Sequence, residues 1–129
     1  MIQKCRYDFL PAIAGPYAHA ARHNQTLYIS GLTALGTNAQ SGGLIEQTEE
    51  VLSQISQILE AEACAISDLI KLTIFVTDIS LLSSIREQLF DFYQGHLPAC
   101  SLVEISALIH PDLQIEIEAI AGLGHTHGV

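Results

Sequence analysis

Positively charged residues are scarce in this sequence. Its 129 residues include 5 lysines and arginines against 14 aspartates and glutamates, which gives a formal net charge of −9. Proteins that bind nucleic acids or anionic membranes present clustered cationic side chains to the phosphates. Five scattered cations form no such cluster, so we expect neither a nucleic-acid partner nor a membrane partner. We attribute the acidity to solubility.

The cysteines and histidines show no metal-binding spacing. Cys5, Cys64 and Cys100 are odd in number and far apart, so we expect neither a zinc site nor a disulfide framework. His125 and His127 form an HxH pair near the C-terminus, but no third ligand lies close in the sequence. We therefore expect no metal, and no sequence feature indicates a cofactor.

Long apolar runs and a leader segment are also missing. No basic-then-apolar signal opens the chain, and the uncharged stretch 24–45 is interrupted by four glycines. We therefore expect no secretion signal and no membrane span. Unpaired cysteines are typical of a reducing compartment, so the sequence predicts a cytoplasmic protein.

The length and the apolar content predict one domain that assembles with copies of itself. A chain of 129 residues fits a single domain, which we place at residues 1–122, followed by a flexible C-terminal tail at 123–129. Hydrophobic residues make up 49% of the chain. A domain this small cannot bury all of them internally, so we expect a homo-oligomer.

Residue periodicity predicts an α+β fold with the element order β-β-α-β-α-β-β. Apolar residues at helical spacing predict a helix over 45–63 and a second helix between Asp78 and Gly95. Alternation of apolar and polar residues predicts strands at 17–21, 26–30, 69–77, 100–106 and 113–121. We expect one sheet with both helices on one face.

The stretch from Pro98 to Ala121 contains the most unusual pattern. It predicts two apolar strands joined by a turn at Pro111, and the second strand places Glu116 and Glu118 on one side. An unpaired buried charge is costly, so carboxylates on a strand near the core indicate a site or an interface.

Four segments resemble the RidA/YjgF family of small trimeric proteins. They are PAIAGPY (11–17), YISG (28–31), KLTIFVTD (71–78) and the stretch 98–121 with its EIEAIA ending. The resemblance implies a chorismate-mutase-like fold, a homotrimer and clefts between subunits that bind a small metabolite. It also implies hydrolysis of reactive enamines and imines to keto acids and ammonia.

The same resemblance assigns roles to individual residues. Tyr17 matches the tyrosine that lines the cleft, Ser30 a polar contact to the ligand, and Gly31 a backbone contact. Glu116 matches the acid that positions the attacking water, which is a role that C=N hydrolysis requires. Glu116 could instead be a structural acid at a subunit interface.

The main departure from the family pattern is Cys100. Active members have an arginine there that binds the substrate carboxylate, and a thiol cannot replace its planar fork. Leu102 and Leu32 are further departures. Cys100 could be an inert filler, a reactive thiol or a remnant of the lost arginine. Arg86 could supply a relocated cation or could simply face solvent.

These departures leave three functions open. The first is an imine or enamine hydrolase with altered substrate preference. The second is a trimer that binds or senses a metabolite without chemistry, because the carboxylate-binding arginine is missing. The third is an interaction or holdase protein that uses exposed apolar surface. Whether the protein is an enzyme therefore depends on whether deaminase activity survives at Cys100.

Overall fold

Two eight-residue strands with alternating apolar and polar residues lie side by side in the sheet of the computed structural model, which describes residues 1–124. These strands, β4 (Leu69–Val76) and β6 (Ile115–Gly122), pair in antiparallel orientation. On β6, Ile115, Ile117 and Ala119 are buried, whereas Glu116 and Glu118 project from the other side. The alternation predicted for this strand is confirmed.

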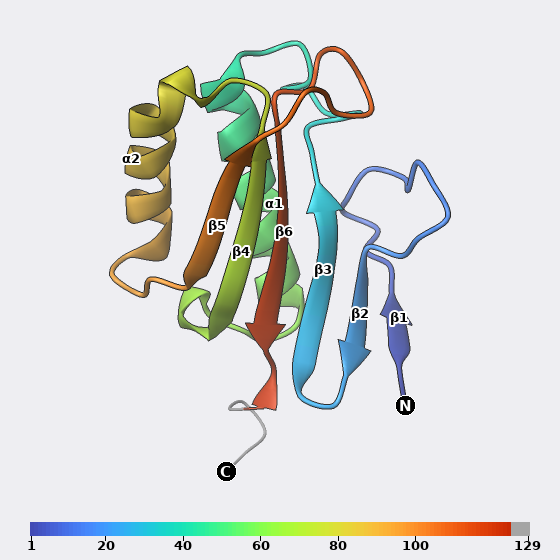
Figure 1. Ribbon diagram of the computed structural model, residues 1–129. Helices are drawn as coiled ribbons and strands as arrows, with labels where there is room; N and C mark the ends of the chain where they lie inside the picture. The colour runs from blue at the N-terminus through green and yellow to red at the C-terminus, as the bar shows by residue number, and fades with distance from the viewer. Residues whose placement is uncertain (125–129) are drawn as a thin grey trace.

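Six strands make up the sheet, in the order β1-β2-β3-β6-β4-β5 (Figure 1). The other strands are β1 (Gln3–Cys5), β2 (Ala20–His23), β3 (Thr26–Leu32) and β5 (Ala99–Glu104). All pairs are antiparallel except β4 and β5, which are parallel. The predicted hairpin of β2 and β3 is confirmed, and its turn places Asn24 at a φ of 56°. Its first strand lies at Ala20–His23, however, and not at the predicted residues 17–21.

The two helices bury apolar stripes against one face of this sheet. Helix α1 (Leu44–Ala61) buries its predicted stripe almost completely, and α2 (Leu82–Tyr93) buries Ile85, Leu89 and Tyr93. The α1 stripe consists of Val51, Leu52, Ile55, Ile58 and Leu59. Short 3-10 turns, η1 (Ile66–Asp68) and η2 (Ile79–Leu81), precede β4 and α2.

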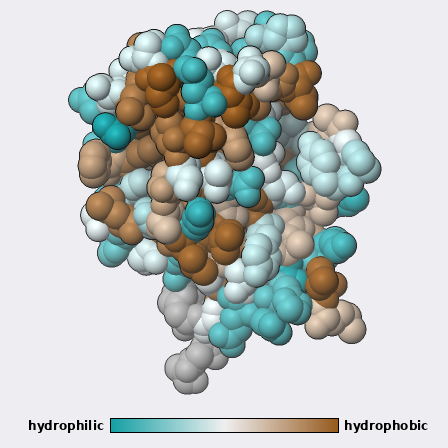
Figure 2. Space-filling view, viewed as in Figure 1, coloured by the Kyte–Doolittle hydropathy of each residue, from teal (hydrophilic) through white to brown (hydrophobic). Residues whose placement is uncertain are grey.

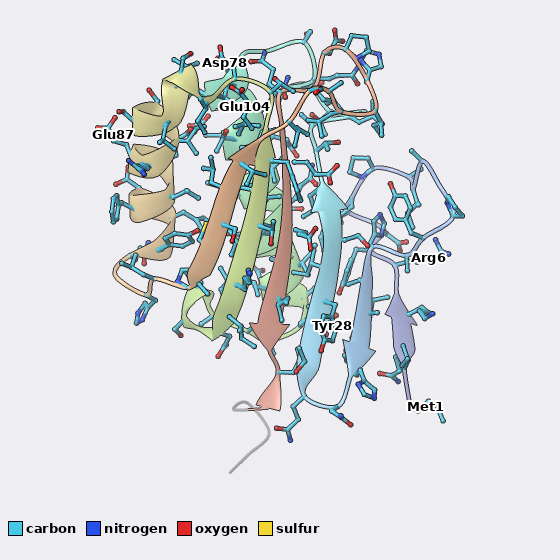
Figure 3. The ribbon with its side chains drawn as sticks, viewed as in Figure 1. Met1, Arg6, Tyr28, Asp78, Glu87 and Glu104 are labelled. Carbon is cyan, nitrogen blue, oxygen red and sulfur yellow. The ribbon has the colours of Figure 1, made fainter. Side chains whose placement is uncertain are left out.

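Polar contacts and backbone conformation fix the two ends of α2. Asp78 accepts a hydrogen bond from the Ser80 amide at 2.9 Å, and Glu104 accepts one from the Ile79 amide at 2.9 Å. Asp78 and Glu104 lie close together at the upper end of β5 (Figure 3). The helix ends at Gln94, whose φ of 49° is left-handed.

The sheet differs from the sequence prediction at both of its edges. Strand β1 was not predicted, because its three residues are too few to show an alternating pattern. Both strands predicted in the stretch from Pro98 to Ala121 are present, but they do not pair as a hairpin, because β4 lies between β5 and β6. Strand β5 instead adds parallel to the outer edge of β4 after the α2 crossover.

The C-terminal boundary also lies slightly beyond the predicted one. Leu123 is buried, and its amide donates a hydrogen bond to the carbonyl of Gln25 at 2.8 Å. The packed domain therefore extends past residue 122. Residues 125–129, which include the HxH pair and most of the predicted tail, lie outside the described residues. Within residues 1–124, no helix is both long and apolar enough to cross a membrane.

The sheet face opposite the helices, here called the open face, is covered by no second layer within residues 1–124 (Figure 1). Large apolar side chains lie on it nevertheless: Tyr28 is 46% exposed and Val103 is 44% exposed. Brown apolar patches are visible on the side of the molecule shown in Figure 2. A small soluble protein rarely leaves such surface bare, so the open face is suited to contact with another chain.

Candidate functional site

Four of the predicted site residues line one small cavity. The segment before β2 contributes Tyr17, β3 contributes Ser30 and Gly31, and β6 contributes Glu116. The cavity, here called the Glu116 cavity, measures about 70 Å³. The four predicted residues come from three separate parts of the chain, and the pairing of β3 with β6 brings two of those parts together.

Gly31 lets the Glu116 side chain lie against the backbone of β3. The pairing of β3 with β6 shifts register between Ile29 and Leu32, next to this position. A Cβ added at Gly31 would lie 2.6 Å from Cδ and 3.0 Å from Cγ of Glu116. Those distances are well inside van der Waals contact, so only glycine accommodates this carboxylate position.

Burial raises the pKa of Glu116, and the nearby charge of Glu118 raises it further. Among the described residues, Glu116 forms no ion pair and no side-chain hydrogen bond. A carboxylate with a raised pKa and no fixed partner can accept a proton from water and release it again. These properties favour a chemical role for Glu116 over a structural one.

The two hydroxyl groups of the cavity differ in what they can offer a ligand. The Ser30 hydroxyl donates to the carbonyl of Ala18 at 2.7 Å, so it presents mainly its lone pairs. Tyr17 is 45% exposed, and its phenol has no hydrogen-bond partner within residues 1–124. Tyr17 is therefore the hydroxyl that can donate to a bound molecule.

Two buried polar residues of the cavity were not predicted as site residues. His19 and Gln54 both line it and are 9% and 3% exposed. The Gln54 amide donates to the Thr33 carbonyl at 3.2 Å and to Glu50 Oε2 at 2.8 Å. The sequence could have indicated Gln54, because it lies beside the apolar stripe of α1, where a buried polar side chain must find hydrogen-bond partners inside the protein.

Cys100 and Arg86 lie together in a different place, a pocket between α2 and β5. This pocket, here called the α2–β5 pocket, has a volume of about 410 Å³ and is largely apolar, with Leu102 and Tyr93 among its lining residues. Within a single chain, Cys100 therefore does not line the Glu116 cavity. Cys100 is in register with Leu72, whose side chain is buried on the helix side.

The Cys100 thiol is not activated. Burial raises its pKa, and this outweighs the opposing effects of the Tyr93 hydroxyl and the Lys71 charge. A thiol with a raised pKa is a poor nucleophile at neutral pH. The Tyr93 hydroxyl is itself buried and makes no hydrogen bond of ordinary geometry with any described residue. Its pKa is raised, mainly by burial and then by Cys100.

A family model assigns the chain to a family of known proteins. The model of the endoribonuclease L-PSP family, which includes the RidA/YjgF proteins, matches residues 10–123. The chain belongs to the RidA/YjgF family. The match covers the Glu116 cavity and the α2–β5 pocket, so both features lie within the family's shared domain.

Individual relatives support this membership. The 2-iminobutanoate/2-iminopropanoate deaminase of Mus musculus is 32% identical over 117 residues, which cover 88% of this chain and 86% of that protein. The Capra hircus protein of the same name is 34% identical over 119 residues, covering 88% and 85%. Within residues 1–124 of this chain, no group of three or more His, Cys, Asp or Glu side chains could hold a metal ion.

Solved structures of RidA/YjgF proteins match the fold closely. RidA from an Antarctic Psychrobacter superposes with a TM-score of 0.83 at 28% identity, covering 93% of this chain and 98% of that one. The Thermotoga maritima structure described as a putative endoribonuclease gives 0.83 at 30% identity, covering 93% and 96%. The predicted mixed α+β architecture, with two helices and one sheet, is therefore confirmed.

Proposed function

We propose that this RidA/YjgF protein hydrolyses the C=N bond of small imines or their enamine tautomers. The observation that carries the proposal is the geometry of Glu116. Its carboxylate is half-buried, lies against Gly31, has a raised pKa and shares a cavity with Tyr17 and Ser30. The imine deaminase names of the mammalian relatives support the same reaction class.

The chemistry requires one water and one group that moves protons. Glu116 takes a proton from the water while the oxygen forms a bond to the imine carbon, and the C=N electrons move to nitrogen. The protonated carboxyl then returns the proton to nitrogen. Glu116 next takes the proton of the hydroxyl and delivers it to the NH₂ group, so that ammonia leaves as the C–N bond breaks and the carbonyl forms. The Tyr17 phenol can donate to the substrate as charge develops.

We further propose that the complete site lies between two copies of the chain in a homotrimer. The Glu116 cavity, at about 70 Å³, is smaller than typical ligand pockets, which range from about 300 to 1,000 Å³. The α2–β5 pocket, at about 410 Å³, falls within that range but carries no candidate base. A second copy packed on the open face would let the two half-sites meet, and the bare apolar surface there supports such packing.

Cys100 makes the expected substrate preference different from that of arginine-containing members. A charge-assisted hydrogen bond contributes about 1.5–3 kcal/mol, so its loss weakens carboxylate binding about tenfold to over a hundredfold. Arg86 lines the same pocket as Cys100 and can supply a cation from a different direction. We therefore propose altered specificity, with apolar imines favoured, rather than loss of the reaction.

Charge argues against the ribonuclease activity that the family name suggests. RNA binding depends on cationic contacts to phosphates, and the net charge of −9 opposes the approach of a polyanion. Neither the Glu116 cavity nor the α2–β5 pocket presents more than one lysine or arginine.

The direct test generates imines in situ with an amino-acid oxidase and traps the unhydrolysed fraction with semicarbazide. We expect the protein to reduce semicarbazone formation, most strongly for apolar amino acids, and Glu116→Gln to abolish the effect. No acceleration with any imine would overturn the proposal. Stabilisation of the protein by keto acids in a thermal-shift screen, together with inactivity, would instead favour a metabolite-binding protein without chemistry.

A further inference from the structure

One wall of the Glu116 cavity has no regular secondary structure. Residues 10–14 line the cavity, yet none of them belongs to a helix or a strand. This wall is therefore positioned by contacts other than the sheet's own hydrogen bonds. Two of these contacts come from the side chain of His19, which is 9% exposed and lies just before β2.

The two ring nitrogens of His19 bind both ends of a short turn. The Tyr7 amide donates to Nδ1 at 2.9 Å, and Nε2 lies 3.1 Å from the carbonyl oxygen of Pro11. The turn is closed by the Leu10 amide, which donates to the Tyr7 carbonyl at 3.2 Å. The His19 ring also stacks on the Tyr7 ring, with centroids 5.9 Å apart.

This arrangement fits only one protonation state of the ring. A carbonyl oxygen can only accept a hydrogen bond, so Nε2 must carry the hydrogen that binds Pro11. An amide can only donate, so Nδ1 must present its lone pair to Tyr7. The ring is therefore the neutral Nε2–H form. A second proton would place a hydrogen on Nδ1 directly opposite the Tyr7 amide hydrogen.

We propose that His19 is a pH-sensitive positioning residue for the wall of the Glu116 cavity. In its neutral form it holds residues 7–11 in place, and on protonation it releases them. The cavity then loses the wall that encloses the reacting groups. The inference rests on the proposed function only for the catalytic importance of the cavity, because the hydrogen bonds exist regardless of any reaction.

Neighbouring charges do not provide an alternative partner for a protonated ring. The Tyr7 hydroxyl donates to Glu62 at 2.7 Å, and Glu62 also pairs with Arg22 at 2.7 Å, so that carboxylate is already engaged. On the cavity side, Glu116 lines the same space as His19. Within residues 1–124, no ion pair or hydrogen bond joins it to the ring.

The sign of the pH dependence follows from this geometry. The hydrogen bonds of His19 are present where the ring is neutral and are lost as the pH falls.

Hydrogen–deuterium exchange of residues 6–17, corrected for the intrinsic effect of pH, tests the proposal without any substrate. Between pH 7.5 and 5.5 we expect this segment of the wild-type protein to lose protection severalfold or more. In His19→Gln the loss should disappear, because an amide oxygen and NH₂ group can make both hydrogen bonds without titrating. His23→Gln, at an exposed histidine that ends β2, serves as the matched control and should behave as wild type. An equal loss in His19→Gln, or no loss in the wild type, would overturn the proposal.

A second measurement requires no variant. Two-bond ¹⁵N–¹H spectra of the imidazole rings identify the tautomer, and at pH 7.5 we expect His19 to be the neutral Nε2–H form. A hydrogen on Nδ1 at this pH would refute the geometry. If imine hydrolysis is absent but the exchange result holds, the proposed function fails and the role of His19 stands. If hydrolysis is present, its acidic limb should move to lower pH in His19→Gln.

Discussion

The substitution Gly31→Ala tests the position of Glu116 without removing any polar group. The backbone at Gly31 does not have a positive φ, so alanine is compatible with it and the effect is purely steric. The added Cβ would lie 2.6 Å from Cδ of Glu116. Ordinary contact begins at 3.4 Å, so Cδ of Glu116 must move by about 0.8 Å.

A displacement of this size is sufficient to affect catalysis strongly. A misplacement of about 1 Å can reduce a reaction rate on the order of 100-fold, so we expect kcat/KM for imine hydrolysis to fall about 10- to 100-fold. The rotamer change should lower the free energy of unfolding by only about 0.5–1.5 kcal/mol. The variant should therefore remain folded at 25 °C while losing most of its activity.

Gly122→Ala provides the matched control for this experiment. It lies on the same strand as Glu116, and its added Cβ would meet its nearest neighbour, Ile70 Cδ1, at an ordinary 3.8 Å. We expect near wild-type hydrolysis from it. Both variants are assayed by semicarbazide competition, with thermal unfolding as the check on folding. Wild-type activity in Gly31→Ala would refute the assignment of the Glu116 position as catalytic.

Two further predictions follow from the charges and side chains of the two half-sites. The pKa of Glu116 is raised in the folded protein, so above that pKa its ionised form destabilises the folded state. This destabilisation disappears below about pH 4.3, where the carboxyl is protonated in the unfolded chain as well. Glu116→Gln should therefore raise the unfolding midpoint at pH 7 but not at pH 4; an equal gain at both would contradict the electrostatic explanation. Cys100→Arg should tighten binding of carboxylated ligands about tenfold to a hundredfold relative to Cys100→Ser, measured by calorimetry, and unchanged affinity would show that the α2–β5 pocket does not receive the carboxylate.

Local periodicity predicted most of the secondary structure because it depends only on neighbouring residues. The stripe from Val51 to Leu59 and the alternation on β6 are short-range patterns, and both are confirmed. Strand order depends instead on contacts between distant segments. The position of β5 beside β4, and not beside β6, follows from the α2 crossover and cannot be read from the pattern of either strand.

The candidate site was predicted only in part, because a family resemblance identifies residues but not how distant strands pair. Tyr17, Ser30, Gly31 and Glu116 matched positions in a known family, and the structure places them around one cavity. The resemblance did not indicate that Cys100 lies on the other side of the sheet within one chain, because that depends on the register with β4. His19 was missed because its role comes from two backbone partners, which carry no signal in the sequence.

A complementation experiment tests most directly whether hydrolysis uses Glu116 of one copy and the α2–β5 pocket of another. Glu116→Gln removes the base, and Cys100→Phe fills the pocket at an exposed position. Each variant alone should be inactive. Each cleft in a closed ring takes Glu116 from one copy and the α2–β5 pocket from the adjacent copy. In random 1:1 co-assembly each of the two half-sites is intact in about half of the clefts, so about one quarter of the clefts have both. We predict about one quarter of wild-type imine hydrolysis in the mixed oligomers. Mixed oligomers as inactive as the separate variants, alongside an active wild type, would contradict a site shared between copies.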